Sequence, residues 1–185
     1  MEFSTVWKRK HLGANHIADI VFFVSAAMFH EKIGQFGSVE IENRIWYDGK
    51  KKRLWATDGA RLHIAGIDFG DGDFTFHIIS KRKNEIIGEI SRERPNLPNI
   101  SIILSQRDKT IAYFDFAEYL DFPKTPEIPY VKFMRLFQKA IISQGFFNDL
   151  FNIPGKWKAL IAEENSAQFF KNENCLAAIM PLNVD

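Results

Sequence analysis

Residues 15–29 are apolar on nearly every side of a helical projection, with polar breaks at Asp19 and Ser25. A helix that is hydrophobic all round has to be buried on most of its surface. Asn15 is a residue type that caps helix N-termini, and Gly34 follows where this helix should have ended. The segment falls short of the roughly 20 residues that a membrane-spanning helix needs. The pattern predicts a helix enclosed within a folded domain.

A different spacing begins at Val39, where apolar residues recur on alternate positions as far as Tyr47. This alternation predicts a β-strand, and the Asp-Gly pair that follows is a hairpin signal. We expect the chain to return as a strand over residues 51–57 and to form a further strand over residues 61–67. The first part of the chain is thus predicted to be one helix followed by three strands.

Helix and strand patterns then recur. Strand-like residues 74–79 lead to Ser80, which can cap a helix over residues 80–91. Residues 100–104 and 110–116 are rich in residues with high β-propensity and predict a hairpin. The repetition favours a fold built from similar helix-plus-strands units.

Residues 131–143 have apolar positions at helical spacing and predict an amphipathic helix. Lys132, Arg135 and Lys139 share one stripe of its other side, because residues spaced by whole helical turns lie one above another. Such a stripe is by default a solvated helix face. A short helical segment is expected over residues 147–151. Strands are expected over residues 157–162, 167–170 and 176–182.

Composition limits the class of protein. The chain has 185 residues, of which 46% are hydrophobic, so it can bury a real core and should be globular. Lys and Arg number 24 against 23 Asp and Glu, so any DNA-binding surface has to come from where the charges lie. The single Cys175 excludes a disulfide framework, and the N-terminus does not resemble a signal peptide. We expect a cytoplasmic protein.

No catalytic constellation is visible in the sequence. Asp68, Asp71 and Asp73 supply oxygen ligands, but they lack the following Glu of a calcium loop and favour a solvated turn. His63 and His77 lie in strand-like segments without a second His nearby, which favours structural roles. We expect no metal, no cofactor and no enzymatic activity. The alternative is a metal-dependent hydrolase using the acidic loop and His77.

Four segments, in order along the chain, resemble signatures of one family. Ala56-Thr57-Asp58-Gly59-Ala60-Arg61-Leu62 is similar to the segment Ala-Thr-Asp-Gly-His-Arg-Leu of the bacterial DNA sliding clamp, the beta subunit of DNA polymerase III. The stretch from Pro126 to Val131 is similar to the connector before the clamp's third domain, and residues 133–143 to the helix that opens that domain. Ala178-Ile179-Met180-Pro181-Leu182-Asn183 resembles the C-terminal strand.

The resemblance implies an α+β, DNA-clamp-like fold of repeated helix-plus-antiparallel-strand units, with sheets outside and helices on one face. It places a clamp-like domain of two halves over residues 1–130 and a partial third unit over residues 131–185. In the family these segments converge on a hydrophobic groove that holds short linear motifs of replication proteins. Carried over by position, the groove would use Thr57, Gly59, Arg61, Leu62, Pro126, Val131, Ala178, Met180, Pro181 and Leu182.

The departures from the family pattern concern size and polarity. A clamp subunit has three domains of two halves each, whereas this chain has about three halves. A ring around DNA would therefore take about four subunits, if about twelve helices are needed. Ala60 stands where the family has His, and Asn183 where it has a basic residue, which removes polar groups from the groove.

Basic helix faces would contact DNA in a clamp. Their side chains would touch phosphates without reading bases, so binding should be non-specific and sensitive to salt. The run from Lys8 to Lys10 is ambiguous in this respect. The basic residues expected on such faces are Lys81, Arg82, Lys83, Lys132, Arg135 and Lys139.

The leading hypothesis is a non-enzymatic, sliding-clamp-like processivity or tethering factor. It would be a homo-oligomer that binds double-stranded DNA and docks a DNA polymerase, or another replication or repair protein, through a short linear motif. The alternative is an adaptor that keeps the peptide groove but has lost the ring. Neither hypothesis involves a membrane.

Overall fold

The structure, a computed structural model, describes the chain in segments: residues 3–11, 13, 16–28, 44–92, 99–107, 112–115, 130–133, 140–161 and 165–181. The chain divides into two compact units, Met1–Pro98 and Asn99–Asp185. This division lies earlier in the chain than the domain boundary that we expected after residue 130. Each unit is described by itself.

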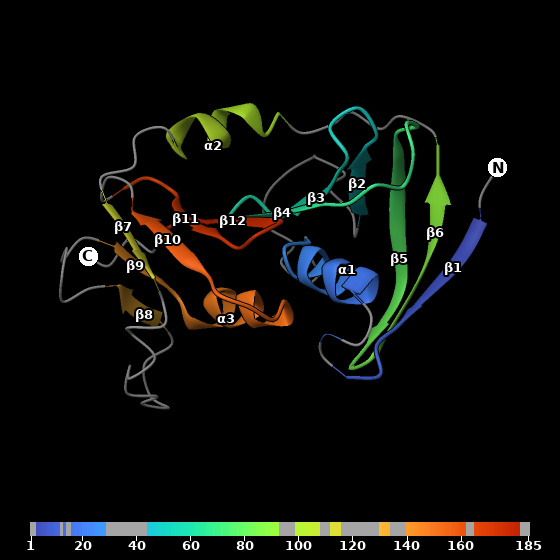
Figure 1. Cartoon of the computed structure of the whole chain (residues 1–185), viewed down its shortest axis with the longest axis horizontal. Coiled ribbons are helices and arrows are strands. Elements are labelled where there is room, and N and C mark those ends of the chain that lie inside the picture. Colours follow the sequence, from blue (N-terminus) through green and yellow to red (C-terminus); the bar gives the residue numbers. More distant parts are fainter. Residues whose placement is uncertain are drawn as a thin grey trace, which may run out of the picture. The chain divides into compact units, whose positions relative to one another are not determined.

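The first unit is an antiparallel sheet with a helix packed on it (Figure 1). Its strands lie in the order β1-β6-β5-β2-β3-β4. The helix and the three strands after it confirm the predicted pattern, whereas β1 was not predicted. The elements are β1 (Phe3–Lys8), α1 (His16–Ala26), β2 (Arg44–Asp48), β3 (Arg53–Thr57), β4 (Arg61–Gly66), β5 (Phe74–Arg82) and β6 (Glu85–Ser91).

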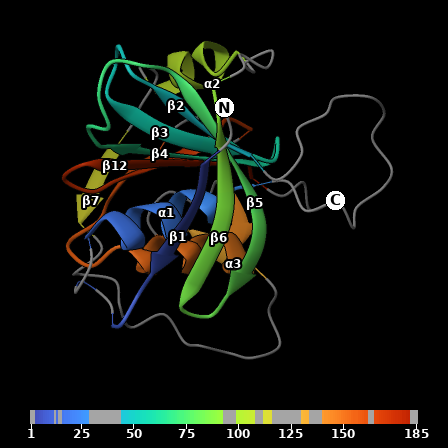
Figure 2. The same ribbon diagram turned by 90° about the vertical axis from the view of Figure 1, so that its right-hand side faces the viewer.

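Helix α1 is enclosed on all sides, as its sequence predicts. Every residue from 18 to 26 is buried, and a run of that length covers the whole circumference of a helix. The helix contacts β1, β2, β3 and β4, and Figure 2 shows the last three of these strands above it. Val21 of α1 lines a small apolar pocket with Ile45 and Leu54, which are at most 2% exposed.

An aromatic cluster continues this core beside α1. Tyr47 stacks on Phe74 with ring centroids 4.7 Å apart. The Tyr47 hydroxyl also donates a hydrogen bond to the carbonyl oxygen of Gly70 at 2.9 Å and accepts one from the backbone N–H of Phe69 at 2.8 Å. These bonds attach the loop between β4 and β5 to the core. The members of the cluster are Trp7, Tyr47, Phe69, Phe74 and Phe76.

Asp19 is a fully buried carboxylate within the apolar helix α1. Its Oδ1 lies 2.5 Å from Arg9 Nε, and its Oδ2 accepts a hydrogen bond from the Gly13 N–H at 2.6 Å. The Arg9 guanidinium in turn lies over the Phe22 ring, 5.0 Å from its centroid. A buried carboxylate is tolerated only when it is paired and hydrogen-bonded. These contacts therefore bind the segment that follows β1 to α1.

Residues 80–91 do not form the helix that we predicted. Strand β5 continues through Arg82, the chain turns, and β6 begins at Glu85. The prediction was wrong because it considered local spacing without the neighbouring strands. Strand β6 lies between β1 and β5, which satisfy its backbone groups on both sides. Along it, buried Ile86 is followed by half-buried Ile87, which is strand periodicity.

The second unit contains an antiparallel sheet in the order β12-β11-β10-β7 and a separate pair, β8-β9. Strands β7, β10, β11 and β12 confirm four predicted strands, and α3 with η3 confirms the short helical segment. The elements are α2 (Ser101–Gln106), β7 (Ala112–Asp115), β8 (Tyr130–Phe133), β9 (Ala140–Ser143), α3 (Gln144–Asn148), the 3-10 helix η3 (Asp149–Asn152), β10 (Lys158–Ile161), β11 (Gln168–Lys171) and β12 (Cys175–Ile179).

Two predictions in this unit were wrong. Residues 100–104 lie mostly in α2 rather than in a strand. Just before the helix, the Asn99 side chain accepts the N–H of Ser101 at 3.1 Å. The amphipathic helix over residues 131–143 is contradicted at both ends, which form β8 and β9. These strands pair with each other, and that pairing outweighs the helical spacing. Residues 134–139 lie outside the described residues.

His63 is buried completely at the contact between β4 and α1. Its ring stacks on Phe23 with centroids 4.4 Å apart, and its Nδ1 lies 2.7 Å from the Phe23 carbonyl oxygen, to which it donates. Among the described residues, its Nε2 is buried without a hydrogen-bond partner. Burial, more than the nearby charges of Arg61 and Lys81, lowers the pKa of His63 to about 3, against the raising effect of the hydrogen bond to the Phe23 carbonyl. The structure therefore holds this imidazole neutral.

We predict that acid destabilises the fold through His63. Because the pKa rises from about 3 in the folded state to about 6.5 on unfolding, the unfolded state binds the extra proton between these values. The contribution of neutral His63 to the free energy of unfolding is complete above pH 6.5. It is lost as the pH falls towards 3, by about 1.4 kcal/mol per pH unit. Urea unfolding at several pH values measures this slope. His63→Gln should lose this component and exposed His77→Gln should keep it; equal slopes in both variants would contradict the prediction.

Candidate functional site

The turn between β3 and β4 is the best-defined part of the predicted peptide groove. The Thr57 hydroxyl donates to the carbonyl oxygen of Arg61 at 2.7 Å and accepts the N–H of Gly59 at 3.1 Å. The backbone N–H of Asp58 also donates to the Arg61 carbonyl, at 3.3 Å. These hydrogen bonds hold the two ends of the turn together.

The Asp58 carboxylate accepts three further hydrogen bonds within the same turn. Its Oδ1 accepts the N–H groups of Ala60 at 3.0 Å and of Arg61 at 2.8 Å. Its Oδ2 accepts a hydrogen bond from Arg61 Nε at 2.8 Å, with both side chains at most 14% exposed. Gly59 has φ +87°, a conformation that only glycine adopts without strain. Each polar residue of the motif thus has a structural function in the turn.

Exposure differs along this motif. Gly59 is exposed, and Arg61 is half-buried. Thr57 and Leu62 are only 5% and 1% exposed, so their side chains belong to the interior. In this conformation a bound peptide can reach the top of the turn at Gly59, but not the Leu62 side chain.

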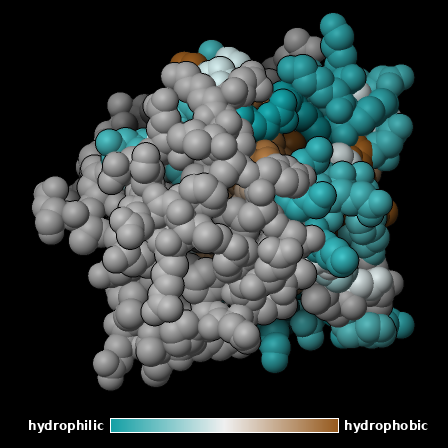
Figure 3. Space-filling view, turned by 60° about the vertical axis from the view of Figure 1, so that its left-hand side comes forward, coloured by the Kyte–Doolittle hydropathy of each residue, from teal (hydrophilic) through white to brown (hydrophobic). Residues whose placement is uncertain are grey.

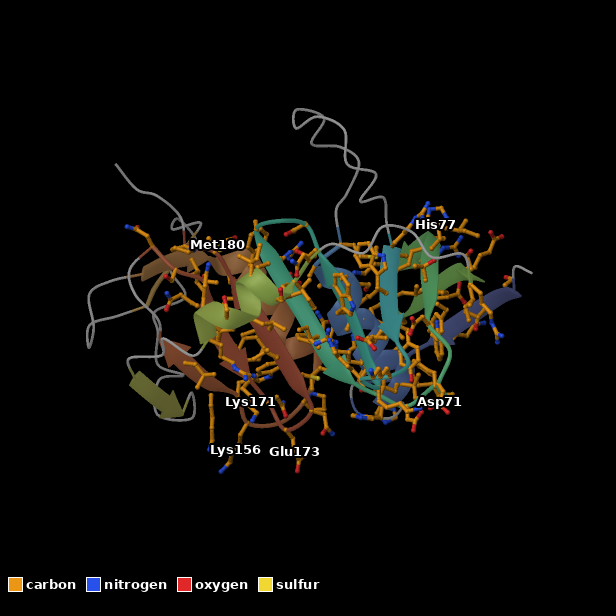
Figure 4. All side chains as sticks on the ribbon, turned by 90° about the horizontal axis from the view of Figure 1, so that it is seen from above. Asp71, His77, Lys156, Lys171, Glu173 and Met180 are labelled. Atoms are coloured by element: carbon orange, nitrogen blue, oxygen red, sulfur yellow. The ribbon has the colours of Figure 1, made fainter. Side chains whose placement is uncertain are left out.

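The second part of the predicted groove follows β12. Ala178 is buried, at 3% exposed, whereas Met180 and Pro181 directly after the strand are half-buried. Met180 is labelled in Figure 4. Val131 lies in β8. The remaining two groove residues, Pro126 and Leu182, lie outside the described residues.

The predicted DNA-binding residues that the structure describes occupy strands and a turn rather than helix faces. Lys81 and Arg82 end β5, Lys83 follows in the turn, and all three are exposed. Lys132 lies in β8, not on a helix. Arg135 and Lys139 lie outside the described residues. The expected basic stripe is therefore not a helix face where the structure describes it.

Helix α1 also differs from the expected DNA-facing helix. Its sequence, from His16 to Ala26, contains no lysine or arginine, and its residues from 18 to 26 are buried. It has neither the charge nor the exposure that phosphate contacts require. Figure 3 shows one face of the molecule in space-filling form. The described part of this face is mostly hydrophilic, with isolated hydrophobic residues.

Two of the candidate metal-binding residues, Asp68 and Asp71, both contact one lysine, and the single cysteine is buried. Lys52 makes ion pairs with Asp68 at 3.1 Å and with Asp71. The hydrogen bond from the Gly70 N–H, more than Lys52, lowers the pKa of Asp68. Burial raises the pKa of Cys175 to about 12, so its thiol is a poor nucleophile at neutral pH.

The described segments contain neither a cluster of metal ligands nor a membrane-spanning helix. Within them, no group of three or more His, Cys, Asp and Glu side chains is placed to hold a metal ion. Nor does any helix within them combine the length and the hydrophobicity needed to cross a membrane.

Comparison with solved structures identifies the fold. A Helicobacter pylori beta clamp bound to a DNA ligase peptide matches 97% of this chain with a TM-score of 0.59 and 12% identity. The DNA polymerase sliding clamps of Pseudomonas aeruginosa and Bacillus subtilis match 99% and 96% of it, with TM-scores of 0.53 and 0.52 and 12% identity in both cases. The chain has the fold of a bacterial sliding clamp.

The clamp resemblance seen in the sequence is thereby confirmed at the level of the fold. The chain covers 65% of the H. pylori clamp and 67% of each of the other two. The chain therefore spans about two thirds of the length of these clamps. No protein-family model matches the sequence, and no curated protein matches it significantly.

We predict that Asp58→Ala destabilises the first unit by about 2 kcal/mol, because it leaves two backbone N–H groups and the Arg61 side chain without their acceptor. Urea unfolding followed by tryptophan fluorescence measures the loss. Asp58→Asn is the matched control, since it keeps an Oδ1 acceptor and removes only the charge, and it should lose less. Equal stability of Asp58→Ala and the parent would show that the turn does not depend on this carboxylate.

Proposed function

We propose that this chain is a non-enzymatic, clamp-like tethering factor that docks a partner protein and holds it on duplex DNA. The observation that carries the proposal is the turn from Thr57 to Leu62, where a clamp-like motif occurs within a clamp fold. The turn is rigid because Asp58 and Thr57 satisfy its backbone groups. A rigid turn suits recognition, since little conformational entropy is lost when a ligand binds.

The proposed ligand of the turn is a short linear motif of a DNA polymerase or another replication or repair protein. The similar H. pylori beta clamp was crystallised with a DNA ligase peptide, which supports this class of ligand. Among the proposed contacts, Gly59 offers exposed backbone, and Met180 and Pro181 offer partly exposed apolar surface. Apolar walls with few polar anchors suit an extended peptide.

The proposed DNA contacts are ionic and independent of sequence. Lys81, Arg82 and Lys83 are exposed at one end of β5, and Lys132, Arg135 and Lys139 remain candidates from the sequence. Flexible cations of this kind neutralise phosphates without reading bases. Affinity for duplex DNA should therefore fall steeply as the salt concentration rises.

One observation favours the second candidate, an adaptor without a ring. Helix α1 is apolar and buried, so it does not offer the basic face that a helix lining a DNA channel would need. Molar mass in solution separates the two proposals. A homo-oligomer supports the ring, whereas a stable monomer of about 21.4 kDa supports the adaptor.

We predict that Met180→Ala weakens binding of a peptide carrying the clamp-binding motif of a DNA ligase by roughly tenfold, because truncation removes the core of an apolar contact. Fluorescence anisotropy of the labelled peptide measures the dissociation constant. Ile102→Ala is the control, since Ile102 is a 65% exposed apolar residue in α2 outside the proposed groove. An unchanged constant in Met180→Ala, or no binding to the parent, counts against the peptide groove.

A further inference from the structure

Two basic triplets that are distant in the sequence lie together at one end of the first unit's sheet. The first, Lys8-Arg9-Lys10, begins at the last residue of β1, and the second, Lys81-Arg82-Lys83, ends β5 and enters the turn to β6. Figure 1 shows the end of β1 beside this turn. We propose that their exposed side chains form one phosphate-binding surface for duplex DNA, named the hairpin-end surface, which adds Lys8 and Lys10 to the DNA contacts. The inference rests on the proposed DNA-binding function.

Strand pairing fixes this arrangement. Lys8 is opposite Glu85 in the β1–β6 pair, and Glu85 is opposite Arg82 in the β5–β6 pair. Beyond the strands, the N–H of Arg9 donates to the carbonyl oxygen of Asn84 at 2.9 Å. The two triplets are therefore neighbours in every molecule that forms this sheet, although about 70 residues separate them in the chain.

The surface has more cations than anions. Lys10, Lys81, Arg82 and Lys83 are exposed, and the Lys8 side chain is 71% exposed. Arg9 does not take part, because it is 11% exposed and paired with buried Asp19. Its contact instead holds the end of β1 against α1.

Glu85 is the carboxylate within this row of cations. It makes an ion pair with Lys8 at 3.2 Å and is itself 25% exposed. An ion pair this exposed contributes little to stability. A phosphate arriving at the surface would compete with Glu85 for Lys8.

A β-bulge between Ile78 and Ser80 distributes the cations around the end of the sheet. Beyond it, Lys81 is opposite buried Ile86 and lies on the side of the sheet that packs on α1. Arg82 lies on the other side, with Lys8. Cations on both sides suit a phosphate backbone that crosses the end of the sheet.

The chemistry of the surface favours duplex DNA over single strands. Single-strand binding usually depends on exposed aromatic side chains on which bases stack. The aromatic residue nearest to the triplets in the sequence, Trp7, faces the core, where its ring meets Phe69 and Phe76. Lysine-rich surfaces without stacking partners contact phosphates only, which is sufficient for non-specific binding to a duplex.

The first test removes one cation from each triplet. We expect Lys10→Ala/Lys83→Ala to weaken binding to a duplex oligonucleotide roughly tenfold at 50 mM salt, and to reduce the slope of log affinity against log salt by about 1.8. Lys50→Ala/Lys51→Ala is the matched control. It removes the same charge from the turn between β2 and β3, at the opposite end of the sheet, and should bind like the parent.

The outcomes separate the inference from the proposed function. If the parent binds the duplex and the two double variants bind equally well, the hairpin-end surface is wrong while DNA binding stands. If the parent does not bind the duplex, both fail. Binding to phosphatidylserine vesicles but not to the duplex would also overturn the assignment to DNA. Circular dichroism verifies that each variant is folded.

The second test strengthens binding instead of weakening it. We expect Glu85→Gln to raise duplex affinity roughly threefold, because it removes the carboxylate that competes with phosphate for Lys8. Glu173→Gln removes an equal charge from an exposed position in the second unit and should have a smaller effect. Loss of affinity in Glu85→Gln, or equal gains in both variants, would contradict the surface.

Discussion

The enclosure of helix α1 is the constraint on which the first unit depends. A helix without a polar side has to be covered completely, and the sheet provides part of that cover through β1, β2, β3 and β4. Two of the buried polar side chains at this contact illustrate how each is accommodated individually. Asp19 obtains its ion pair and backbone donor from the segment after β1, and His63 is held neutral against Phe23. The same enclosure removes α1 from any surface that could meet a charged ligand.

Residues that could contact a partner protein or DNA therefore have to lie outside this helix, in turns and at strand ends. The turn from Thr57 to Leu62 is one such place, where side chains satisfy the backbone and leave Gly59 exposed. The end of the β5–β6 hairpin is the other. Both are held by antiparallel pairing, so their geometry follows from the register of the strands rather than from local helix propensity.

The sequence predicted elements correctly where one segment carried a complete signal. Residues 15–29 were apolar on nearly every side, and the alternation that ends in β2 was followed by an Asp-Gly turn that indicated the returning strand β3. The sequence-based prediction was wrong where a neighbouring strand determined the structure. Residues 80–91 form part of a hairpin because β1 lies beside β6, and β1 itself was not predicted. The motif from Thr57 to Leu62 identified the turn, but not that Leu62 would be buried. The proximity of the two basic triplets is likewise a result of pairing that no local pattern indicates.

The bulge in β5 has a consequence for how this surface can change. A strand with strict alternation would place Ser80 and Arg82 on the side of Phe76 and Ile78, and Lys81 on the opposite side. The extra residue at Ile79 reverses this order for everything beyond it. Loss or gain of one residue at this point would exchange the cations between the two sides without altering any of them. The length of β5, and not only its composition, is therefore part of the specification of the surface.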